Sequence, residues 1–341
     1  MSSAKIRPSI QDVSRLAGVS LGTVSNVLNN RDMVKPATAE KVQRAIDQLG
    51  FVRNDAARQL KAGKSKTLGL VVFDAGNPFF AELARGAEDE AARNSYSVLL
   101  GNSDNKFERE KAYLQLFDEQ RVAGVLISPI QDVYEQIREL RGHGTQTVVV
   151  DRKADAARCC SVSVDDFAGG KIAVEHLIAI GRRKICFVGG SSQIQQVADR
   201  LAGAMAAIST SSGAVQLSVL ESENMTALAG REVGERIAKM LPAERPDAIF
   251  AANDLVAMGI VQAFMLNNEI SIPTDIALIG YDDIDFAEAA VVPLSSIRQP
   301  ARLIGSTAIE LLLDEVQDQD VHKHKQITFQ PELVVRASTT Y

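Results

Sequence analysis

Residues 18–29 read GVSLGTVSNVLN, a stretch with the features of a helix that is too short to be stable by itself. Ser20 is a candidate N-cap, and Thr23 follows it at the third helical position. An apolar stripe at helical spacing consists of Val24, Val27 and Leu28. The opposite side exposes Leu21, Gly22 and Asn26. We therefore expect neighbouring helices to hold the stripe, which leaves the other side free for recognition.

The flanking residues predict those neighbouring helices. Ser9 is a candidate N-cap with Asp12 as its carboxylate partner, and Gly18 ends this first helix. Its buried face is expected to comprise Ile10, Val13, Leu16 and Ala17. A third helix is expected over residues 37–49, ending at Gly50 and burying Val42, Ile46 and Leu49. Three short helices around one small core, with a tight glycine-containing turn, are typical of a helix-turn-helix unit.

Charge is divided unevenly along the chain. Residues 1–64 contain eleven Lys and Arg against five Asp and Glu, a net charge of +6. The whole chain carries −6, so the remainder carries −12. A basic head on an acidic body indicates that only the head meets a polyanion such as DNA. On charge alone, a solvated basic terminus is the alternative.

Composition excludes several classes of protein. The 341 residues predict two or more domains, and 46% apolar residues are enough for sizeable cores. The three Cys, of which Cys159 and Cys160 are adjacent, show neither a disulfide framework nor a metal-ligand spacing. His322 and His324 lie in a polar segment, and we expect no metal and no cofactor. The absence of an apolar signal region and of a bilayer-spanning run predicts a cytoplasmic location.

From residue 67 onward, apolar strands alternate with helices. The strands read TLGLVVF, SVLLGN, GVLISP, QTVVVD, KICFVGG, QLSVL, AIFAAN and IALIGYDD. Helices are expected at residues 78–94, 166–181, 195–211, 226–241 and 254–268. This alternation predicts doubly wound parallel sheets with helices on both faces, the α/β class. There are too many units for one sheet, so we expect a body of two lobes.

Polar and aromatic side chains follow the ends of these strands. Ligands of such sheets bind beyond the carboxyl ends of the strands. The side chains expected to meet there are Asp74, Asn77, Phe79, Phe80, Asp151, Arg152, Arg200, Asn253, Asp282 and Gln299. Aromatic faces cover the C–H surface of a sugar, while carboxylates, guanidinium groups and amides bond its hydroxyl groups. The set therefore indicates a sugar pocket, although helix capping explains any one Asn or Asp taken alone.

The chain resembles the LacI/GalR family of bacterial transcription repressors. The resemblance begins in SIQDVSRLAGVSLGTVSNVLN, residues 9–29, and continues to LVVRAST, residues 333–339. It implies that Leu21, Gly22 and Asn26 read bases. It also implies that Thr23 and Ser25 contact phosphates, and that the N-cap Ser20 belongs to the same DNA-binding surface. An Arg is common where this chain has Asn26. Because Asn pairs with adenine whereas Arg prefers guanine, we expect an operator that departs from the commonest family sequence.

Residues 54–63, NDAARQLKAG, resemble the hinge helix of that family. Ala56 and Leu60 favour a short helix, and Gly63 stops it. Such a helix is marginal alone. The resemblance implies that it orders when two copies pair on DNA, with Leu60 inserted into the minor groove. The residues that match the hinge pattern are Asn54, Ala57 and Arg58, whereas Arg53 replaces a frequent Pro.

The body resembles periplasmic sugar-binding proteins, and most of all the ribose-binding protein. The matching motifs include Asn77-Pro78-Phe79-Phe80 and Asp151-Arg152. The resemblance implies that Phe79 and Phe80 contact the sugar ring. The groups expected to bind the hydroxyls are Asp151, Arg152, Arg200, Asn253, Asp282 and Gln299. The resemblance makes D-ribose the expected inducer. Met225 stands near the position of the third aromatic of that pocket, and this departure leaves a related pentose or a nucleoside open.

These observations predict the domain organisation. Residues 1–52 form the DNA-binding head, 53–65 the hinge helix and linker, and 66–341 the two-lobed effector-binding and dimerisation body. Lobe 1 is expected to comprise residues 66–164 and 295–325, and lobe 2 residues 165–294 and 326–341. The chain ends without a heptad tail, so we expect a homodimer on double-stranded, pseudo-palindromic operator DNA.

Three alternatives compete with an inducible repressor. An enzyme is disfavoured because the chain lacks a GxGxxG motif after a strand, a complete phosphate loop and an HExxH motif. A sugar-binding transport receptor would need a signal peptide and would not need the basic head. The third alternative keeps the repressor but makes a purine, a nucleoside or another sugar its corepressor, because sequence does not fix the sign of allosteric coupling.

Overall fold

The computed structural model describes residues 8–51, 65–211, 213–267, 270–317 and 322–340. The chain divides into two units between Lys64 and Ser65, and each unit is described by itself. Among the helices in the described ranges, none is long and apolar enough to cross a membrane.

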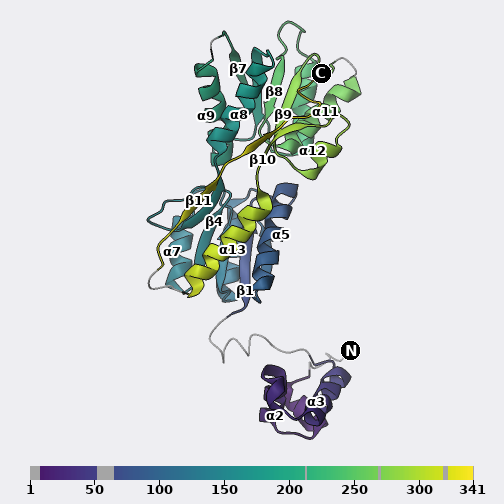
Figure 1. Cartoon of the computed structure of the whole chain (residues 1–341), viewed down its shortest axis with the longest axis vertical. Coiled ribbons are helices and arrows are strands. Elements are labelled where there is room, and N and C mark those ends of the chain that lie inside the picture. The colour runs from purple at the N-terminus through teal and green to yellow at the C-terminus, as the bar shows by residue number, and fades with distance from the viewer. Residues whose placement is uncertain (1–7, 52–64, 212, 268–269, 318–321, 341) are drawn as a thin grey trace. The chain divides into compact units, whose positions relative to one another are not determined.

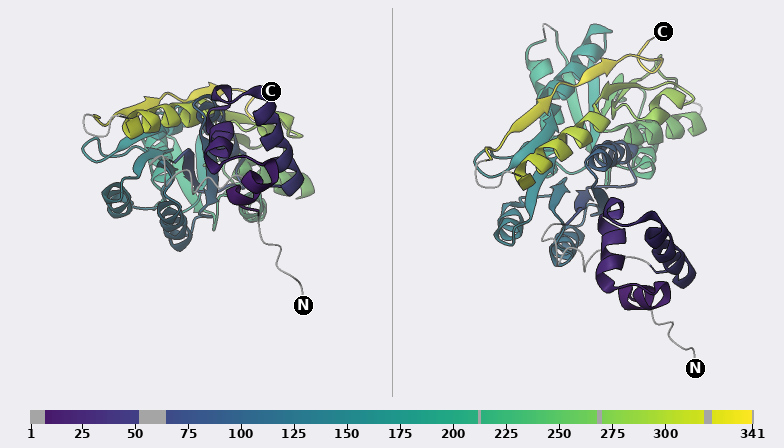
Figure 2. Two further views of the ribbon diagram at one scale, coloured as in Figure 1. Left: turned by 90° about the horizontal axis from the view of Figure 1, so that it is seen from below. Right: turned by 60° about the horizontal axis from the view of Figure 1, so that its bottom comes forward.

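The first unit is a bundle of three helices (Figure 2, dark purple). Its elements are α1 (Ile10–Ala17), α2 (Leu21–Asn29), the 3₁₀ turn η1 (Arg31–Met33) and α3 (Pro36–Leu49). Ser9 and Asp12 cap α1 reciprocally, and Ser20 caps α2 by accepting a 3.1 Å bond from the backbone N–H of Thr23. Gly18 follows α1 with a φ of 64°, a conformation that strains residues with a side chain. The predicted caps and helix ends are confirmed.

One small apolar core holds this bundle together. Its buried members are Val13, Val24, Val27, Ala39, Val42 and Ala45. Leu16, predicted on the buried face of α1, is 46% exposed, so that prediction is wrong. So small a core covers only the stripe of α1 centred on Val13, and Leu16 lies beyond its edge. Because Val24 and Val27 are buried, the opposite side of α2 faces outward.

The second unit contains two six-stranded sheets, one in each lobe (Figure 1). The lobe 1 sheet is parallel, in the order β11 (Gln326–Phe329), β5 (Cys160–Val164), β4 (Gln146–Val150), β3 (Gly124–Ile127), β1 (Thr67–Val72) and β2 (Ser97–Asn102). The lobe 2 sheet has the order β12 (Glu332–Val334), β10 (Ser295–Arg298), β9 (Ala277–Asp282), β8 (Ala248–Ala251), β6 (Lys184–Gly189) and β7 (Gln216–Glu221). Only β12 pairs antiparallel among these described strands, so the predicted parallel sheets are confirmed.

Helices cover both sheets. Those of lobe 1 are α5 (Pro78–Arg93), α6 (Phe107–Glu119), α7 (Tyr134–Gly142) and α13 (Ala301–Gln317). Those of lobe 2 are α8 (Asp166–Ala179), α9 (Gln195–Ser209), α10 (Ala227–Ala238), α11 (Asp254–Asn267) and α12 (Asp285–Ala289). Apolar strand residues such as Leu70 and Phe250 are fully buried beneath these helices.

The chain crosses between the lobes three times, and two crossings differ from the prediction. β10 was expected in lobe 1, but it pairs with β9 in lobe 2. β11 was expected in lobe 2, but it pairs with β5 in lobe 1. Each strand continues a parallel ladder to its carboxyl end before the chain leaves the lobe, so the crossings follow Val164, Arg298 and Phe329. In Figure 1 the yellow ribbon of β11 and β12 passes from one lobe to the other.

A close crossing of α8 and α9 in lobe 2 fixes the position of a residue that faces lobe 1. Gly170 of α8 and Gly203 of α9 face each other's helix backbone. A Cβ at Gly170 would lie 2.0 Å from the carbonyl oxygen of Arg200, and one at Gly203 would lie 2.0 Å from that of Phe167. Only residues without a side chain permit this approach, which sets the position of Arg200 on α9.

Candidate functional site

In the first unit, α2 presents the side that the sequence predicts for base recognition. Leu21, Gly22 and Asn26 are exposed, whereas Val24 and Val27 are buried. Leu21 is 45% exposed although it is apolar. A helix held by its buried stripe, with its first turn exposed, has the form of a major-groove recognition helix.

Some polar side chains of α2 and its N-cap are hydrogen-bonded within the helix, and one is not bonded to any described residue. The hydroxyl oxygens of Ser20 and Thr23 lie 2.9 Å apart. The hydroxyl of Ser25 accepts a 3.2 Å bond from Nδ2 of Asn29. Among the described residues, none bonds the side-chain amide of Asn26, so its donor and its acceptor are free to pair with a base edge. The predicted hinge contacts lie outside the described residues, and these are Asn54, Ala57, Arg58 and Leu60.

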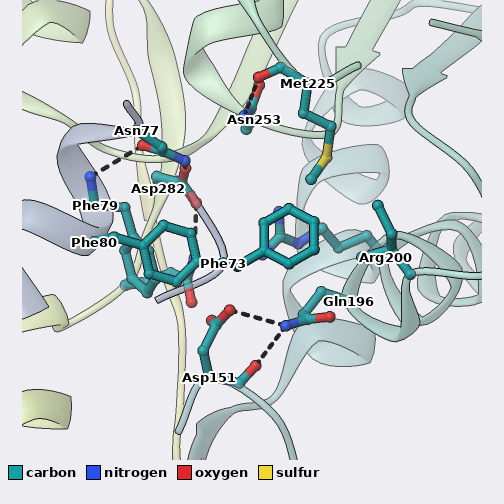
Figure 3. A pocket seen from close by; sticks show the side chains of 12 residues that line it. Phe73, Asn77, Phe79, Phe80, Asp151, Gln196, Arg200, Met225, Asn253 and Asp282 are labelled. Atoms are coloured by element: carbon teal, nitrogen blue, oxygen red, sulfur yellow. Dashed lines mark hydrogen bonds between the residues drawn. The ribbon is translucent and has the colours of Figure 1, made fainter. Parts of the chain in front are cut away.

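In the second unit, a cavity lies between the lobes at the carboxyl ends of the strands (Figure 3). It is lined by Phe73, Asn77, Phe79, Phe80, Asp151, Ile194, Gln196, Arg200, Met225, Asn253, Asp282 and Gln299. Its volume is about 30 Å³, which corresponds to about two water molecules. A sugar-sized ligand therefore enters only when side chains or the lobes themselves move.

Three aromatic rings form one wall of the cavity. Phe79 and Phe80 begin α5, and their ring centroids are 5.1 Å apart in an edge-to-face arrangement. Phe73 follows β1 and stacks on Phe80, with 6.3 Å between the ring centroids. Figure 3 shows the Phe73 ring lying between these two rings and Arg200. The wall offers flat apolar surface of the kind that covers the C–H face of a sugar or a heterocyclic base.

Asp282 accepts hydrogen bonds from residues on both sides of the cavity. Nδ2 of Asn77, in lobe 1, donates to Oδ2 of Asp282 at 2.9 Å, and Nε2 of Gln299 donates to Oδ1 at 2.7 Å. The other amide atom of Gln299, Oε1, is buried and has no partner among the described residues. An unpaired buried acceptor costs free energy, so this oxygen is a ready partner for a ligand hydroxyl or amino group.

Asp151 mirrors this arrangement from lobe 1. Nε2 of Gln196, in lobe 2, donates to Oδ2 of Asp151 at 2.8 Å and to its carbonyl oxygen at 2.9 Å. Burial, with a smaller contribution from the charge of Asp166, raises the pKa of Asp151 to about 8. Burial also raises the pKa of Asp282. Each lobe therefore supplies a buried carboxyl group that accepts a bond from an amide of the other lobe.

The two carboxyl residues have an unusual backbone conformation. Asp151 has a φ of 62° and Asp282 a φ of 106°, both in the left-handed region that strains residues with a Cβ. Backbone strain of this kind costs on the order of 1–3 kcal/mol and clusters at functional sites. Both side chains line the cavity.

Arg200 is buried and already paired within lobe 2. Its Nε donates to Oδ1 of Asp166 at 2.8 Å, its Nη1 donates to the carbonyl of Ala252 at 2.6 Å, and its guanidinium lies 3.6 Å from the ring centroid of Tyr281. These contacts hold the guanidinium at the cavity wall in a fixed orientation. A fixed guanidinium can bond two ligand oxygens without first losing side-chain entropy.

Asn253 and Met225 complete the lobe 2 wall together. Asn253 caps α11 by accepting a 2.9 Å bond from the backbone N–H of Val256, and its Nδ2 donates to the carbonyl of Met225 at 3.0 Å. The thioether of Met225 projects into the cavity (Figure 3). Asn253 thus positions the segment that carries the adaptable Met225 side chain.

Comparisons with known proteins agree with this architecture. The profile of bacterial regulatory proteins of the lacI family matches residues 9–54, and that of the periplasmic binding protein-like domain matches residues 174–339. The HTH-type transcriptional repressor PurR of Vibrio parahaemolyticus is 33% identical over 96% of this chain and 97% of its own. The chain belongs to the LacI family of bacterial transcription repressors.

Solved structures of LacI-family proteins share this fold. The lac repressor dimer bound to operator and the anti-inducer ONPF is 25% identical, covers 98% of this chain and 100% of its own, and superposes with a TM-score of 0.81. A LacI family regulator from Enterococcus faecium with bound ribose is 28% identical, covers 80% of this chain and 98% of its own, and has a TM-score of 0.72.

The sequence-predicted pocket of this LacI-family chain comes together almost completely. Of the predicted effector-binding residues, only Arg152 does not line the cavity, since its Nη1 donates to the carbonyl of Gln131 at 2.8 Å. Asp74, which also follows a strand, accepts a 2.8 Å bond from the backbone N–H of Gly76 and shapes the turn. The prediction missed Phe73, Ile194 and Gln196. The strand-end rule points to Phe73, which directly follows β1, whereas no sequence signal marks the other two.

Proposed function

We propose that this LacI-family repressor releases its operator when a pentose, D-ribose, binds between the lobes of its body. The observation that carries the proposal is the pairing of an aromatic wall with buried carboxyl, amide and guanidinium groups from both lobes. Aromatic rings alone suit many apolar ligands, and polar groups alone suit ions. Their combination around one cavity is what a hydroxyl-rich ring requires. The bound ribose in the related E. faecium regulator supports the same class of ligand.

Two residue pairs that are hydrogen-bonded across the cavity supply the switch in this proposal. Gln196 to Asp151 and Asn77 to Asp282 join the lobes directly. A sugar that enters offers hydroxyl groups to the same carboxyls, so it replaces direct links between lobes with links through the ligand. A ligand acts on DNA binding only through its different affinity for two arrangements of the body. We propose that this difference is transmitted to the hinge segments of a homodimer.

On DNA, we propose that α2 lies in the major groove and that Leu21, Gly22 and Asn26 face the bases. Ser20, Thr23 and Ser25 then lie beside the phosphates, and Leu60 inserts into the minor groove. The exposure of these three residues supports this orientation, as does the side-chain amide of Asn26, which has no partner among the described residues. We infer that the chain is a cytoplasmic regulator and not an enzyme, because the sequence lacks the catalytic motifs named above and its relatives are transcriptional repressors.

A purine base or nucleoside acting as corepressor is the second candidate. The repressor named PurR in V. parahaemolyticus matches this chain at 33% identity, above the 28% of the ribose-bound regulator. Met225, at the edge of the cavity, can adapt to a flat base as well as to a sugar. Calorimetric titration with D-ribose, other pentoses, nucleosides and purine bases separates the two candidates. No heat with any pentose, together with saturable binding of a purine base, would replace the first candidate by the second.

DNA binding is tested independently of the effector. The fragment comprising residues 66–341 corresponds to the second compact unit. We expect it to keep ligand binding and to lose operator binding, whereas the full chain binds an operator selected from random DNA. Each phosphate contact should contribute about −0.9 to the slope of log affinity against log salt concentration. Operator binding by the fragment would refute the assignment of DNA recognition to the head.

A further inference from the structure

A cluster of four side chains that bind metals in other proteins lies in lobe 1. It consists of Cys160, Glu315, His322 and His324. Cys160 begins β5, Glu315 lies in the last turn of α13, and the two histidines precede β11, which pairs with β5. Figure 1 shows that α13 ends beside α7. The cluster is thus at the amino-terminal end of the sheet, opposite the end that forms the ligand pocket.

The distances between the donor atoms are near those of a tetrahedral site. Sγ of Cys160 lies 3.1 Å from Nε2 of His322 and 3.9 Å from Nδ1 of His324. Oε1 of Glu315 lies 3.4 Å from Nε2 of His322 and 2.9 Å from Nδ1 of His324. Zinc bond lengths of about 2.0–2.3 Å at tetrahedral angles require donors about 3.3–3.6 Å apart. These four distances therefore differ from the required spacing by about half an ångström or less, and all the donor atoms lie within 4.8 Å of one another.

We propose that Cys160, Glu315, His322 and His324 bind one Zn²⁺ ion. One thiolate, two imidazoles and one carboxylate are all zinc ligands, and four protein ligands make a closed structural site. The ion would join the end of α13, the start of β5 and the segment that enters β11. That segment leads to the third crossing between the lobes, so the ion would stabilise the lobe 1 end of this connection.

The surroundings of the cluster fit a metal site. Cys160 is fully buried, and the side chain of Glu315 is 2% exposed. Oε2 of Glu315 has no hydrogen-bond partner among the described residues. The backbone N–H of Lys325 donates to Sγ of Cys160 at 3.2 Å, the kind of outer contact that stabilises a metal-bound thiolate.

Two other roles for the cluster explain less of it. Arg141 contacts both Glu315 (3.4 Å) and Nε2 of His324 (3.2 Å), so the groups also form a hydrogen-bond network without an ion. In that network His322 contacts the thiol of Cys160. Oε2 of Glu315 has no partner among the residues that the structure describes. A nucleophilic role for Cys160 is disfavoured because the side chain is fully buried and burial raises the pKa of its thiol to about 12. A bound cation displaces the proton of the Cys160 thiol and is coordinated by all four side chains.

The test uses full-length protein from which metals have been removed with a chelator. Titration with Zn²⁺ in competition with a chromogenic chelator should show one ion bound per chain and a melting temperature that rises with bound zinc. Co²⁺ in the same site should show the intense visible bands of tetrahedral coordination and a thiolate-to-cobalt charge-transfer band. Wild-type protein that binds no stoichiometric ion would overturn the proposal.

Matched variants assign the ligands. Cys160→Ser should abolish the charge-transfer band, and His322→Asn should keep the band while weakening zinc binding at least about 10-fold. The controls are Cys159→Ser, which removes an equally buried thiol, and His143→Asn, which removes an exposed imidazole. Both should bind zinc as the wild type does. Zinc affinity unchanged in His322→Asn, or lost equally in the controls, would contradict the assignment even if Cys160→Ser fails to fold.

Discussion

Nδ2 of Asn77 donates a 2.9 Å hydrogen bond to Oδ2 of Asp282, although the two residues belong to different lobes and are separated by 205 positions. The bond lies in the wall of the cavity, which also contains Oε1 of Gln299, an atom with no partner in the described part of the chain. Contact between the lobes and recognition of the ligand therefore use the same carboxyl group. A change at this carboxyl should alter effector binding without altering the DNA-binding head.

Asp282→Ala should weaken D-ribose binding about 10- to 100-fold, because hydrogen bonds to a charged group contribute about 1.5–3 kcal/mol. Asp285→Ala, three residues later and exposed at the start of α12, is the control and should bind as the wild type does. Calorimetric titration measures both. Equal affinities of the two variants would remove Asp282 from the ligand site.

Asp151→Asn should change how stability depends on pH. The folded pKa of about 8 lies far above the ordinary value of 3.8, so the unfolded chain ionises this carboxyl first as the pH rises. The stability associated with the protonated group is fully present below about pH 4 and is lost as the pH rises to about 8. The Asn side chain of the variant is uncharged at every pH, so the variant does not lose this stability as the pH rises.

The melting temperature of the wild type should therefore fall relative to that of Asp151→Asn between about pH 4 and pH 8, and the difference should be constant above that window. Melting curves of both proteins in matched buffers test this. Two parallel curves across the whole window would show that the Asp151 carboxyl is not held in its protonated form.

Gly203→Ala should lower the free energy of unfolding by about 1–3 kcal/mol, the usual effect of overpacking. Alanine normally stabilises a helix interior by about 0.5–1 kcal/mol, but a Cβ here would lie 2.0 Å from the carbonyl oxygen of Phe167. Gly142→Ala, at the end of α7 with no atom within 4 Å of the added Cβ, is the control. Urea denaturation should show a loss only for the first variant, and a gain for both would contradict the close crossing of α8 and α9.

Asn26→Ala should relax the base preference at one position of each operator half-site, by about 1–3 kcal/mol. The reason is that this amide is exposed on the outer side of α2 and bonds no residue in the described part of the chain. Gln43→Ala on α3, whose amide bonds Asp47, should leave the preference unchanged. Selection from a randomised operator library measures both. An identical selected sequence for Asn26→Ala and the wild type would exclude Asn26 from base readout.

Much of this architecture could be predicted from local sequence patterns. The capping residues Ser9 and Ser20 bond their own helix, so three or four residues suffice to identify them. Asn77 and Asp282 were predictable as pocket residues because they are polar and lie at or just after the ends of strands. Parallel strands bring their carboxyl ends to one edge of the sheet. The assignments of β10 and β11 to the lobes failed because strand pairing depends on partners far along the chain.

Two other features also depend on contacts between residues far apart in the sequence. They are the part of the cavity wall that lies on α9 and the proposed zinc cluster. Gln196 reaches Asp151 only because the lobes face each other, and no local pattern encodes that relation. Cys160 is distant in sequence from the three other members of its cluster, so no ligand spacing appears in the chain. Arg152 follows the strand-end rule but turns to the carbonyl of Gln131, since the rule places a residue at the edge without fixing its side chain.

Operator affinity of the full-length protein, measured with and without saturating D-ribose, tests the central claim most directly. Ribose should weaken operator binding, and operator DNA should weaken ribose binding by the same factor, about 5- to 150-fold, because the coupling is reciprocal. Operator affinity unchanged by ribose but increased by a purine base would contradict the account.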